Sequence, residues 1–253
     1  MKYFSLFLKN IFSGIWYPVI NSLFPNYCRV CDDILWGGRL AFCEDCLSEI
    51  PRISEQRHCK VCGSLYFVDE NTLCQHCGSG FHETVYFKKN ISRFSYMGPI
   101  QKLILQGKFH GRLSCWTFLG KEMLNDLLEQ DWDADMLVTA VPVSRKRMAE
   151  RGFNQSDIMG RIIARGLALP YKANCLKKIR NTVRQASLNH IDRINNPVGS
   201  YQVTNNKAVR GKGILLVDDV FTTGSTVNEC SRVLMEAGAK VIYTVTAARR
   251  DLG

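Results

Sequence analysis

The sequence predicts an α/β protein whose mainly parallel sheet is flanked by helices, with a small metal-bound module at its N-terminal side. From residue 81 onwards, short apolar strands alternate with amphipathic helices, which is the order that produces βαβ units and a parallel sheet. Residues 28–80 instead contain four Cys-x-x-Cys pairs and few long apolar runs, so a hydrophobic core alone cannot hold them. With 253 residues, 46% of them hydrophobic, the chain can form one such domain and one small module.

Three regions of the chain differ in net charge. Residues 1–27 carry +2, residues 28–80 carry −3 and residues 81–253 carry +11, within a total of +10. We expect these regions to be three domains: an apolar N-terminal helix, a cysteine module and an α/β domain. Because the basic excess lies in the last of them, phosphate-bearing ligands are expected to bind there.

The first 27 residues predict an amphipathic helix that is broken near Pro18. Its apolar side chains recur at steps of three or four residues, at Phe4, Leu8, Ile11, Ile15 and Val19. This face can pack against the rest of the protein, or it can lie weakly on a membrane surface with Lys2 and Lys9 near lipid phosphates. The sequence alone leaves both interpretations open.

No segment approaches the ~20 apolar residues that a membrane span needs, so no transmembrane segment is expected. The apolar run at residues 3–8 is interrupted by Lys9 and Asn10, and no small-residue cleavage site follows it. A reducing, cytoplasmic location is therefore expected, in which cysteines bind metal ions more readily than they form disulfides.

The α/β domain is expected to contain a regular series of elements. Strands are predicted at residues 136–141, 213–217 and 241–247, and helices at residues 99–106, 114–129, 155–167 and 226–236. The strongest helix carries an apolar stripe of Trp116, Leu119, Met123, Leu127 and Leu128. Residues 84–87 and 93–96 predict a hairpin around Asn90. Residues 180–200 have no apolar period, and such a long loop in a compact domain is usually functional or mobile.

The cysteine module repeats itself. Its pairs are Cys28/Cys31, Cys43/Cys46, Cys59/Cys62 and Cys74/Cys77, and the second two pairs follow the first two at a period of 31 residues. Two residues between cysteines form a tight knuckle that aims two thiolates at one ion, and two knuckles complete a tetrahedron around Zn²⁺. The repeat favours sequential pairing, with the first four cysteines on one ion and the last four on another. A cross-brace between alternate knuckles is the alternative.

Four thiolates leave no open position for water, so both zinc sites are expected to be structural. Disulfides, free thiols and an iron–sulfur site are the other interpretations of the same cysteines. Charge argues against a nucleic-acid contact here, because the region carries −3 and each set of four thiolates around Zn²⁺ adds further negative charge. A structural role or a contact with a partner protein is expected instead.

A candidate phosphate loop follows the predicted strand at residues 213–217. The sequence there reads Asp218-Asp219-Val220-Phe221-Thr222-Thr223-Gly224-Ser225-Thr226, and a helix is expected to follow. Gly224 can adopt backbone angles that turn successive N–H groups inward, and a helix start adds free N–H groups and a positive dipole end. The four hydroxyls can donate further hydrogen bonds to a phosphate. An acidic turn beside a helix cap is the alternative.

Asp218 and Asp219 stand at the carboxyl end of this strand, where open α/β sheets bind their ligands. Adjacent carboxylates can accept hydrogen bonds from two neighbouring sugar hydroxyls, and they can hold Mg²⁺ directly or through water. The acids and the loop together resemble the 5-phosphoribosyl-1-diphosphate loop of type I phosphoribosyltransferases. The resemblance implies a type I phosphoribosyltransferase-like fold with Asp218 and Asp219 as catalytic residues. It also implies that the ligand is bound by both acids and by Thr222, Thr223, Gly224, Ser225 and Thr226.

A basic segment follows the predicted strand at residues 136–141. It reads Ser144-Arg145-Lys146-Arg147, then Glu150-Arg151-Gly152-Phe153-Asn154-Gln155. Composition fits either a solvated turn or a loop whose cations offset the charge that builds on a diphosphate leaving group. The run Val-Pro-Val followed by Arg-Gly-Phe-Asn-Gln resembles the signature of the ComF/GntX family, the competence and DNA-utilisation relatives of phosphoribosyltransferases. The resemblance favours diphosphate binding by Arg145, Lys146 and Arg147.

Other segments share this resemblance, which extends from about residue 25 to the end of the chain. Lys108-Phe109 follows a short helix as in that family, whose members also begin with a cysteine-rich zinc ribbon. The family's long loop is matched by Gln185, Leu188, Arg193, Asn196 and Tyr201. Tyr201 stands where Phe is usual, and the arginine cluster around Arg193 is shortened. If the protein is an enzyme, we expect the loop at residues 181–199, with Arg184, Gln185 and Arg193, to close over the site and exclude water, and we expect Arg151 of the earlier basic segment to act with these residues.

The first functional hypothesis is an enzyme that transfers the phosphoribosyl group of 5-phosphoribosyl-1-diphosphate to an unidentified acceptor, in connection with DNA uptake or utilisation. Thr222 stands where purine-specific relatives carry a carboxylate, so a purine acceptor is not supported. One alternative is a non-catalytic protein that binds single-stranded DNA through its basic C-terminal domain. Another is a sensor that binds the sugar phosphate without turnover.

Overall fold

A computed structural model describes residues 26–28, 30–35, 42–50, 52–53, 58–65, 73–74, 77, 84–132, 135–180 and 197–250. The chain divides into two compact units, Met1–Ile50 and Pro51–Gly253. In the first, β1 (Asn26–Tyr27) pairs antiparallel with β2 (Ile34–Leu35), and α2 (Glu44–Ser48) follows. The helix expected within residues 1–27 lies outside the described residues. Among the described helices, none is long and apolar enough to cross a membrane.

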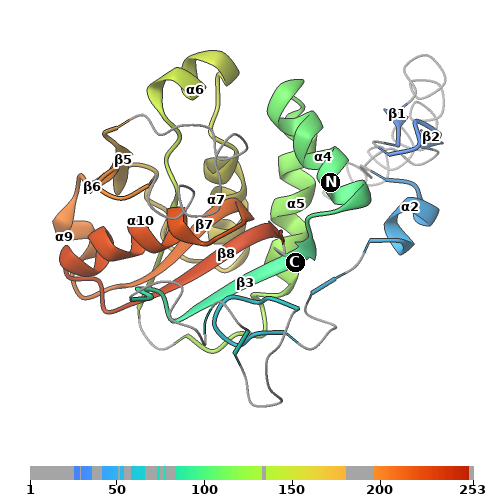
Figure 1. Ribbon diagram of the computed structural model, residues 1–253. Helices are drawn as coiled ribbons and strands as arrows, with labels where there is room; N and C mark the ends of the chain where they lie inside the picture. The colour runs from blue at the N-terminus through green and yellow to red at the C-terminus, as the bar shows by residue number, and fades with distance from the viewer. Residues whose placement is uncertain are drawn as a thin grey trace, which may run out of the picture. The chain divides into compact units, whose positions relative to one another are not determined.

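A four-stranded parallel sheet forms the centre of the larger unit (Figure 1). Its order is β3 (Lys89–Ser95), β8 (Val241–Arg249), β7 (Gly213–Phe221) and β4 (Met136–Ala140). One row of partners crosses the whole sheet, from Ile91 through Val245 and Val217 to Ala140. Because all four strands are parallel, their carboxyl ends meet at one edge, and Asp218 directly follows this row on β7.

Helices cover both faces of this sheet. On one face, α5 (Leu113–Asn125) and α7 (Gln155–Gly166) pack side by side, α5 against β3 and β8 and α7 against β4 and β7. On the other face, α10 (Ser225–Glu236) packs against β7 and β8 (Figure 1). The strands therefore need apolar side chains in both directions, and residues 214–217 of β7 are fully buried. The predicted α/β architecture, a parallel sheet flanked by helices, is confirmed.

The other described elements of the larger unit either connect these strands to the helices or form a second, two-stranded sheet. α4 (Gly98–Phe109) connects β3 to α5, and α6 (Arg145–Arg151) connects β4 to α7. β5 (Leu176–Lys178) pairs antiparallel with β6 (Tyr201–Val203), and α9 (Asn206–Val209) leads into β7. Residues 181–196, which include most of the long predicted loop, lie outside the described residues.

Two sequence predictions about the domain are wrong. The predicted hairpin around Asn90 is instead the single strand β3, which pairs in parallel with β8. Asn90 lies inside this strand and not in a turn. Its buried side chain hydrogen-bonds Ser92 and Thr244. Leu128, placed in the apolar stripe of the strongest helix, is 59% exposed although Leu127 is buried, since α5 ends at Asn125 and the helical period no longer holds beyond it.

Candidate functional site

The two acids at the carboxyl end of β7 are held by residues from two helices. Asp218 Oδ1 accepts hydrogen bonds from Ser156 Oγ at 3.0 Å and from the backbone N–H of Asp219 at 2.9 Å. Asp219 Oδ2 accepts from Gln155 Nε2 at 2.7 Å and forms an ion pair with Lys108 Nζ at 2.8 Å. Gln155 and Ser156 begin α7, and Lys108 lies in the last turn of α4. The site therefore assembles three segments that are distant in sequence.

The segment before α7 explains how Gln155 and Ser156 reach the acids. Gly152 has φ 78° and ends α6 in the left-handed conformation, donating its N–H to Met148 O. Asn154 then caps α7: its Oδ1 accepts from the Ser156 N–H at 3.1 Å, and its Nδ2 donates to Val141 O at 3.0 Å. The cap thus fastens the start of α7 to the end of β4. The Arg-Gly-Phe-Asn-Gln run is a turn and cap that directs two side chains at the acid pair.

The two acids differ in their electrostatic surroundings. Burial, reinforced by the neighbouring charge of Asp219, raises the pKa of Asp218 to about 7. Burial would also raise the pKa of Asp219, but the charge of Lys108 and the hydrogen bonds from Lys108 and Gln155 outweigh it and lower that pKa. Arg151 adds a smaller effect in the same direction. Asp219 is therefore the more acidic carboxyl of the pair and keeps its negative charge beside Lys108, whereas the pKa of Asp218 is raised.

The candidate phosphate loop, residues 222–226, follows the acids after Val220 and Phe221, the last two residues of β7. Gly224 has φ 78° and is the N-cap of α10, which has no side-chain cap at this end. The hydroxyls of Thr223 and Ser225 are buried and lie 2.8 Å apart in a mutual hydrogen bond, whereas Thr222 and Thr226 are half-buried. The Ser225 N–H donates to Thr223 Oγ1 at 3.4 Å, and Gly224 at the cap position offers no side-chain acceptor to the other first-turn N–H groups of α10, where the positive end of the helix dipole lies.

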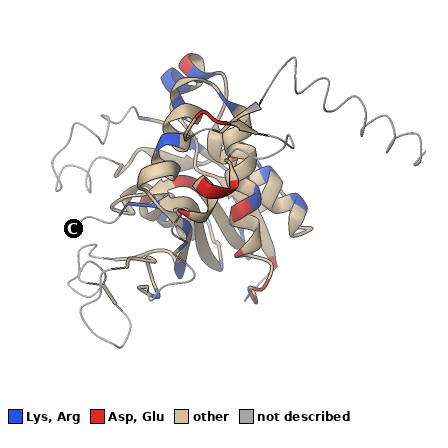
Figure 2. Ribbon diagram, turned by 90° about the vertical axis from the view of Figure 1, so that its right-hand side faces the viewer, with Lys and Arg blue, Asp and Glu red and all other residues tan. Residues whose placement is uncertain are grey.

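The basic residues predicted to bind diphosphate lie on α6, not on a loop. Arg145 and Lys146 are exposed, and Arg147 is half-buried in the same first turn, which Ser144 caps. Figure 2 shows mainly basic residues on α6 (Arg145–Arg151). Arg151 donates Nη1 to Gln155 Oε1 at 3.3 Å, which places it beside the acid pair.

A lysine and a tyrosine lie near the same loop. Lys178 of β5 lies over the ring of Tyr201 of β6, with Nζ 5.1 Å from the ring centroid. Burial, followed by the positive charge of Arg147, lowers the pKa of Lys178 to about 8, while the charge of Asp218 opposes this shift. Burial also raises the pKa of Tyr201, whose hydroxyl interacts with Thr226. These residues link α6 and the β5–β6 pair to the phosphate loop.

The cysteines form two separate groups of four. Within each group, all four Sγ atoms lie within 4.8 Å of one another: Cys28, Cys31, Cys43 and Cys46 in the first, and Cys59, Cys62, Cys74 and Cys77 in the second. Tetrahedral thiolates on one Zn²⁺ lie about 3.8 Å apart. The Sγ atoms of Cys31 and Cys43 are 3.7 Å apart, and those of Cys62 and Cys74 are 3.4 Å apart. The residues fit two structural zinc ions, and the cysteines group sequentially as predicted.

We expect metal analysis of the purified chain to find about two zinc ions per molecule. A double substitution within one group, Cys28→Ser with Cys46→Ser, should leave one ion. A double substitution across the groups, Cys28→Ser with Cys59→Ser, should leave none. Equal zinc content in the two double variants would contradict the sequential grouping.

Comparison with known proteins agrees with this arrangement. Residues 19–82 match the double zinc ribbon domain family, and residues 158–251 match the phosphoribosyl transferase domain family. Competence protein F of Haemophilus influenzae is 26% identical to the chain over 233 residues, which cover 90% of this chain and 99% of that protein. The resemblance to the ComF/GntX family is confirmed.

The chain is also similar to DNA utilization protein YhgH of Escherichia coli, which is 27% identical over 222 residues, covering 86% of this chain and 94% of that protein. Among solved structures, the chain is similar to glutamine phosphoribosylpyrophosphate (PRPP) amidotransferase from B. subtilis. That similarity has a TM-score of 0.35 at 22% identity and covers 52% of this chain and 26% of the other.

The ComF/GntX resemblance drew attention to Lys108 and Gln155 without giving either a role. Their contacts with Asp219 join positions far apart in the chain, so no local pattern could predict them. Ser156 was missed, because a serine in the first turn of a helix carries no distinctive signal. Arg184, Gln185 and Arg193 lie outside the described residues.

Proposed function

We propose that this protein binds 5-phosphoribosyl-1-diphosphate at the carboxyl end of β7 and transfers its phosphoribosyl group to an acceptor. The observation that carries the proposal is the short distance along the chain between the acid pair and the helix start: Asp218 and Asp219 lie near the end of the strand β7, and Gly224, five residues after Asp219, caps α10. A ligand with two neighbouring hydroxyls and a terminal phosphate satisfies both the acid pair and the helix start.

Each part of the ligand has a matching group in the site. The sugar hydroxyls donate to the acid pair, in which the hydrogen bonds and the ion pair described above use only Oδ1 of Asp218 and Oδ2 of Asp219. The 5-phosphate accepts from the N–H groups and hydroxyls of residues 222–226. The diphosphate extends towards Arg151 and the first turn of α6, where Arg145, Lys146 and Arg147 offset its charge.

Mg²⁺ belongs to the same proposal. Asp218 and Asp219 each offer a further carboxylate oxygen, and oxygens of this kind are the ligands that Mg²⁺ prefers. These residues would hold the ion directly or through water, and the ion would neutralise charge on the departing diphosphate. The residues present therefore fit the metal.

The reaction is a substitution at the anomeric carbon of the sugar. A lone pair of the acceptor forms the new bond to this carbon while the carbon–oxygen bond to diphosphate breaks, and diphosphate leaves with that electron pair. The fixed negative charge of Asp219 lies where positive charge develops on the sugar ring, which favours the transition state electrostatically. The relatives' names connect them with competence and DNA utilisation, so we propose that the acceptor or its product serves DNA uptake or utilisation.

Calorimetry with 5-phosphoribosyl-1-diphosphate and Mg²⁺ tests the binding step, and release of diphosphate tests the transfer. We expect the wild-type chain to bind, and Asp219→Asn to bind or turn over at least about a hundredfold less well, because the variant loses the charge that Lys108 compensates. Full binding and turnover by Asp219→Asn would reject the proposal. Binding with no diphosphate release under any acceptor would indicate the sensor instead.

Asp135→Asn is the matched control for this experiment. Asp135 also pairs with a lysine, Lys212, but it is 68% exposed and precedes β4, at the amino end of the strands. The same chemical change at this position should leave ligand affinity within about twofold of wild type.

Ligand affinity should fall as pH rises from about 7.5 to 9.5. The pKa of Lys178 is about 8 without ligand, and an anion bound near Lys178 and Arg147 favours the protonated lysine and raises that pKa. The gain in affinity is therefore complete below pH 8 and is lost as pH rises through the higher pKa of the complex. Calorimetry across this range should give a flatter profile for Lys178→Met. An unchanged profile in this variant would remove Lys178 from the ligand site.

A further inference from the structure

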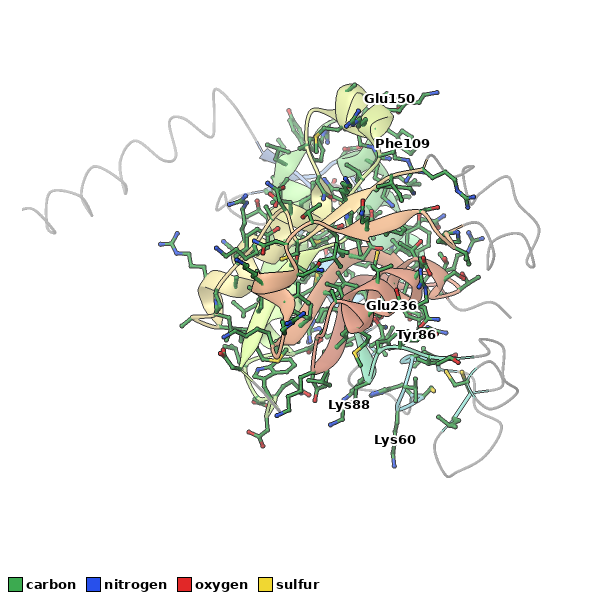
Figure 3. The ribbon with its side chains drawn as sticks, turned by 90° about the vertical axis from the view of Figure 1, so that its left-hand side faces the viewer. Lys60, Tyr86, Lys88, Phe109, Glu150 and Glu236 are labelled. Carbon is green, nitrogen blue, oxygen red and sulfur yellow. The ribbon has the colours of Figure 1, made fainter. Side chains whose placement is uncertain are left out.

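The second cysteine group is docked on the sheet of the larger unit through a knuckle, residues 59–64. Asn90 on β3 donates its backbone N–H to Val61 O at 2.7 Å and its Nδ2 to Cys62 O at 3.2 Å. The side chain of Asn90 also accepts from Thr244 on β8 at 2.9 Å. Figure 3 shows Lys60 of the knuckle near Lys88, on the side of the domain away from Phe109 and Glu150. The knuckle is thus tied to two neighbouring strands.

Arg249, at the end of β8, makes a second link. Its Nη1 donates to Cys62 O at 2.9 Å, and the residue is only 2% exposed. The guanidinium also lies over the ring of Phe221, with the central carbon 4.8 Å from the ring centroid. One buried side chain therefore joins a zinc-ligand residue to the residue that directly precedes the phosphate loop.

Phe221 forms the floor of the phosphate loop. A Cβ added at Gly224 would lie 2.4 Å from the ring Cζ of Phe221, so the ring lies directly against the loop glycine. Phe87 packs edge-on against the same ring at a centroid distance of 6.0 Å. The backbone oxygen of Phe221 accepts from the Arg250 N–H at 2.8 Å. The position of the loop therefore depends on a ring that Arg249 and Phe87 hold in place.

Burial and charge connect the same groups. One hydrophobic cluster contains Phe87 and Phe221, together with Cys59, Cys62 and Cys74 and with Val227 of α10. Four thiolates around one Zn²⁺ carry a net charge of about −2, which stabilises the buried positive charge of Arg249. Packing and electrostatics therefore both extend from the second zinc site to the loop.

We propose that Arg249 is a positioning residue through which the second zinc site holds the phosphate loop in its binding conformation. This inference rests on the proposed function, because 5-phosphoribosyl-1-diphosphate is the ligand that reports on the loop. The proposal adds to that function a dependence on metal: the protein should bind the ligand tightly only when zinc occupies the second site.

The test compares variants of the full chain in the presence of zinc. Arg249→Lys keeps the positive charge but removes the planar guanidinium, which donates to Cys62 O and lies over the ring of Phe221. We expect calorimetry to show about tenfold weaker binding of 5-phosphoribosyl-1-diphosphate with unchanged zinc content, and a larger loss for Cys62→Ser. Cys28→Ser, which removes a ligand of the first site, is the matched control and should bind within about twofold of wild type. Wild-type affinity in zinc-loaded Arg249→Lys would overturn the proposal.

Hydrogen exchange without ligand separates this proposal from failure of the proposed function. The amides of residues 222–226 should exchange faster in Arg249→Lys and Cys62→Ser than in wild type or Cys28→Ser. If wild type binds no sugar phosphate and this difference persists, the proposed function fails and the coupling stands. Equal exchange in all four proteins overturns the coupling whatever the ligand does.

Thermodynamic linkage supplies an independent measurement. If zinc in the second site tightens ligand binding about tenfold, the ligand must tighten that zinc by the same factor. Titration with a coloured chelator should therefore find that saturating ligand protects one of the two zinc ions. Protection that survives in Arg249→Lys would show that the coupling follows another route and would overturn the role of Arg249.

Discussion

Gly224→Ala is expected to weaken binding of 5-phosphoribosyl-1-diphosphate by about a hundredfold while the chain stays folded. Gly224 has φ 78°, a conformation that costs an L-residue about 1–2 kcal/mol. Its new Cβ would also lie 2.4 Å from Cζ of Phe221, so either the ring or the loop must move. Because the ring is held by Arg249 and Phe87, the loop is expected to give way. Calorimetry measures the affinity, and circular dichroism checks the fold.

Gly211→Ala is the control for backbone strain alone. Gly211 has φ 74°, but nothing lies within 4 Å of an added Cβ, and the residue precedes β7 at the end away from the loop. This variant should lose about 1 kcal/mol of unfolding free energy and keep its ligand affinity. If Gly224→Ala binds as tightly as Gly211→Ala, the loop tolerates displacement and does not hold the phosphate as proposed.

The sequence predicted those features of the site that are local. The apolar strand, the acids and the turn are consecutive, so their order alone determines that the acids stand where a strand ends and a helix begins. The two cysteine groups were predictable for the same reason, since the repeat of the cysteine pairs favours the sequential grouping that the structure has. Periodicity also gave the helices α4, α5, α7 and α10 and the strands β4, β7 and β8 to within a few residues at each end, but it did not give α6 or the short antiparallel strands.

Contacts between distant segments could not be predicted in this way. Lys108 reaches Asp219 only because α4 and β7 are brought together by the sheet, and the sheet order does not follow chain order. The hairpin prediction failed at Asn90 because an asparagine can satisfy its side chain in a buried polar network as well as in a turn. The link from Cys62 to Arg249 joins two ends of the chain and has no local signal.

Arg93→Met is expected to lower the free energy of unfolding by about 3–5 kcal/mol, the largest loss of stability predicted for a single substitution here. Arg93 of β3 forms ion pairs with Glu122 at 3.2 Å and with Asp126 at 2.5 Å, and its side chain is 9% exposed. Methionine fills the space but leaves two poorly solvated carboxylates without this cation. The loss should be measured by urea unfolding at neutral pH.

The consequence of this substitution should extend from stability to the ligand site. Glu122 lies in α5 and Asp126 caps the end of that helix, so Arg93 fastens α5 to the sheet. In turn, α5 packs against α7, which carries the acid-binding residues Gln155 and Ser156.

Arg161→Met is the control for the stability measurement. Arg161 pairs with Asp157 but is 60% exposed, so its loss should cost less than about 1 kcal/mol of unfolding free energy. Adding Glu122→Gln and Asp126→Asn to Arg93→Met removes both stranded charges and should recover part of the stability. If the triple variant is no more stable than Arg93→Met alone, the loss comes from packing around the arginine and not from uncompensated charge.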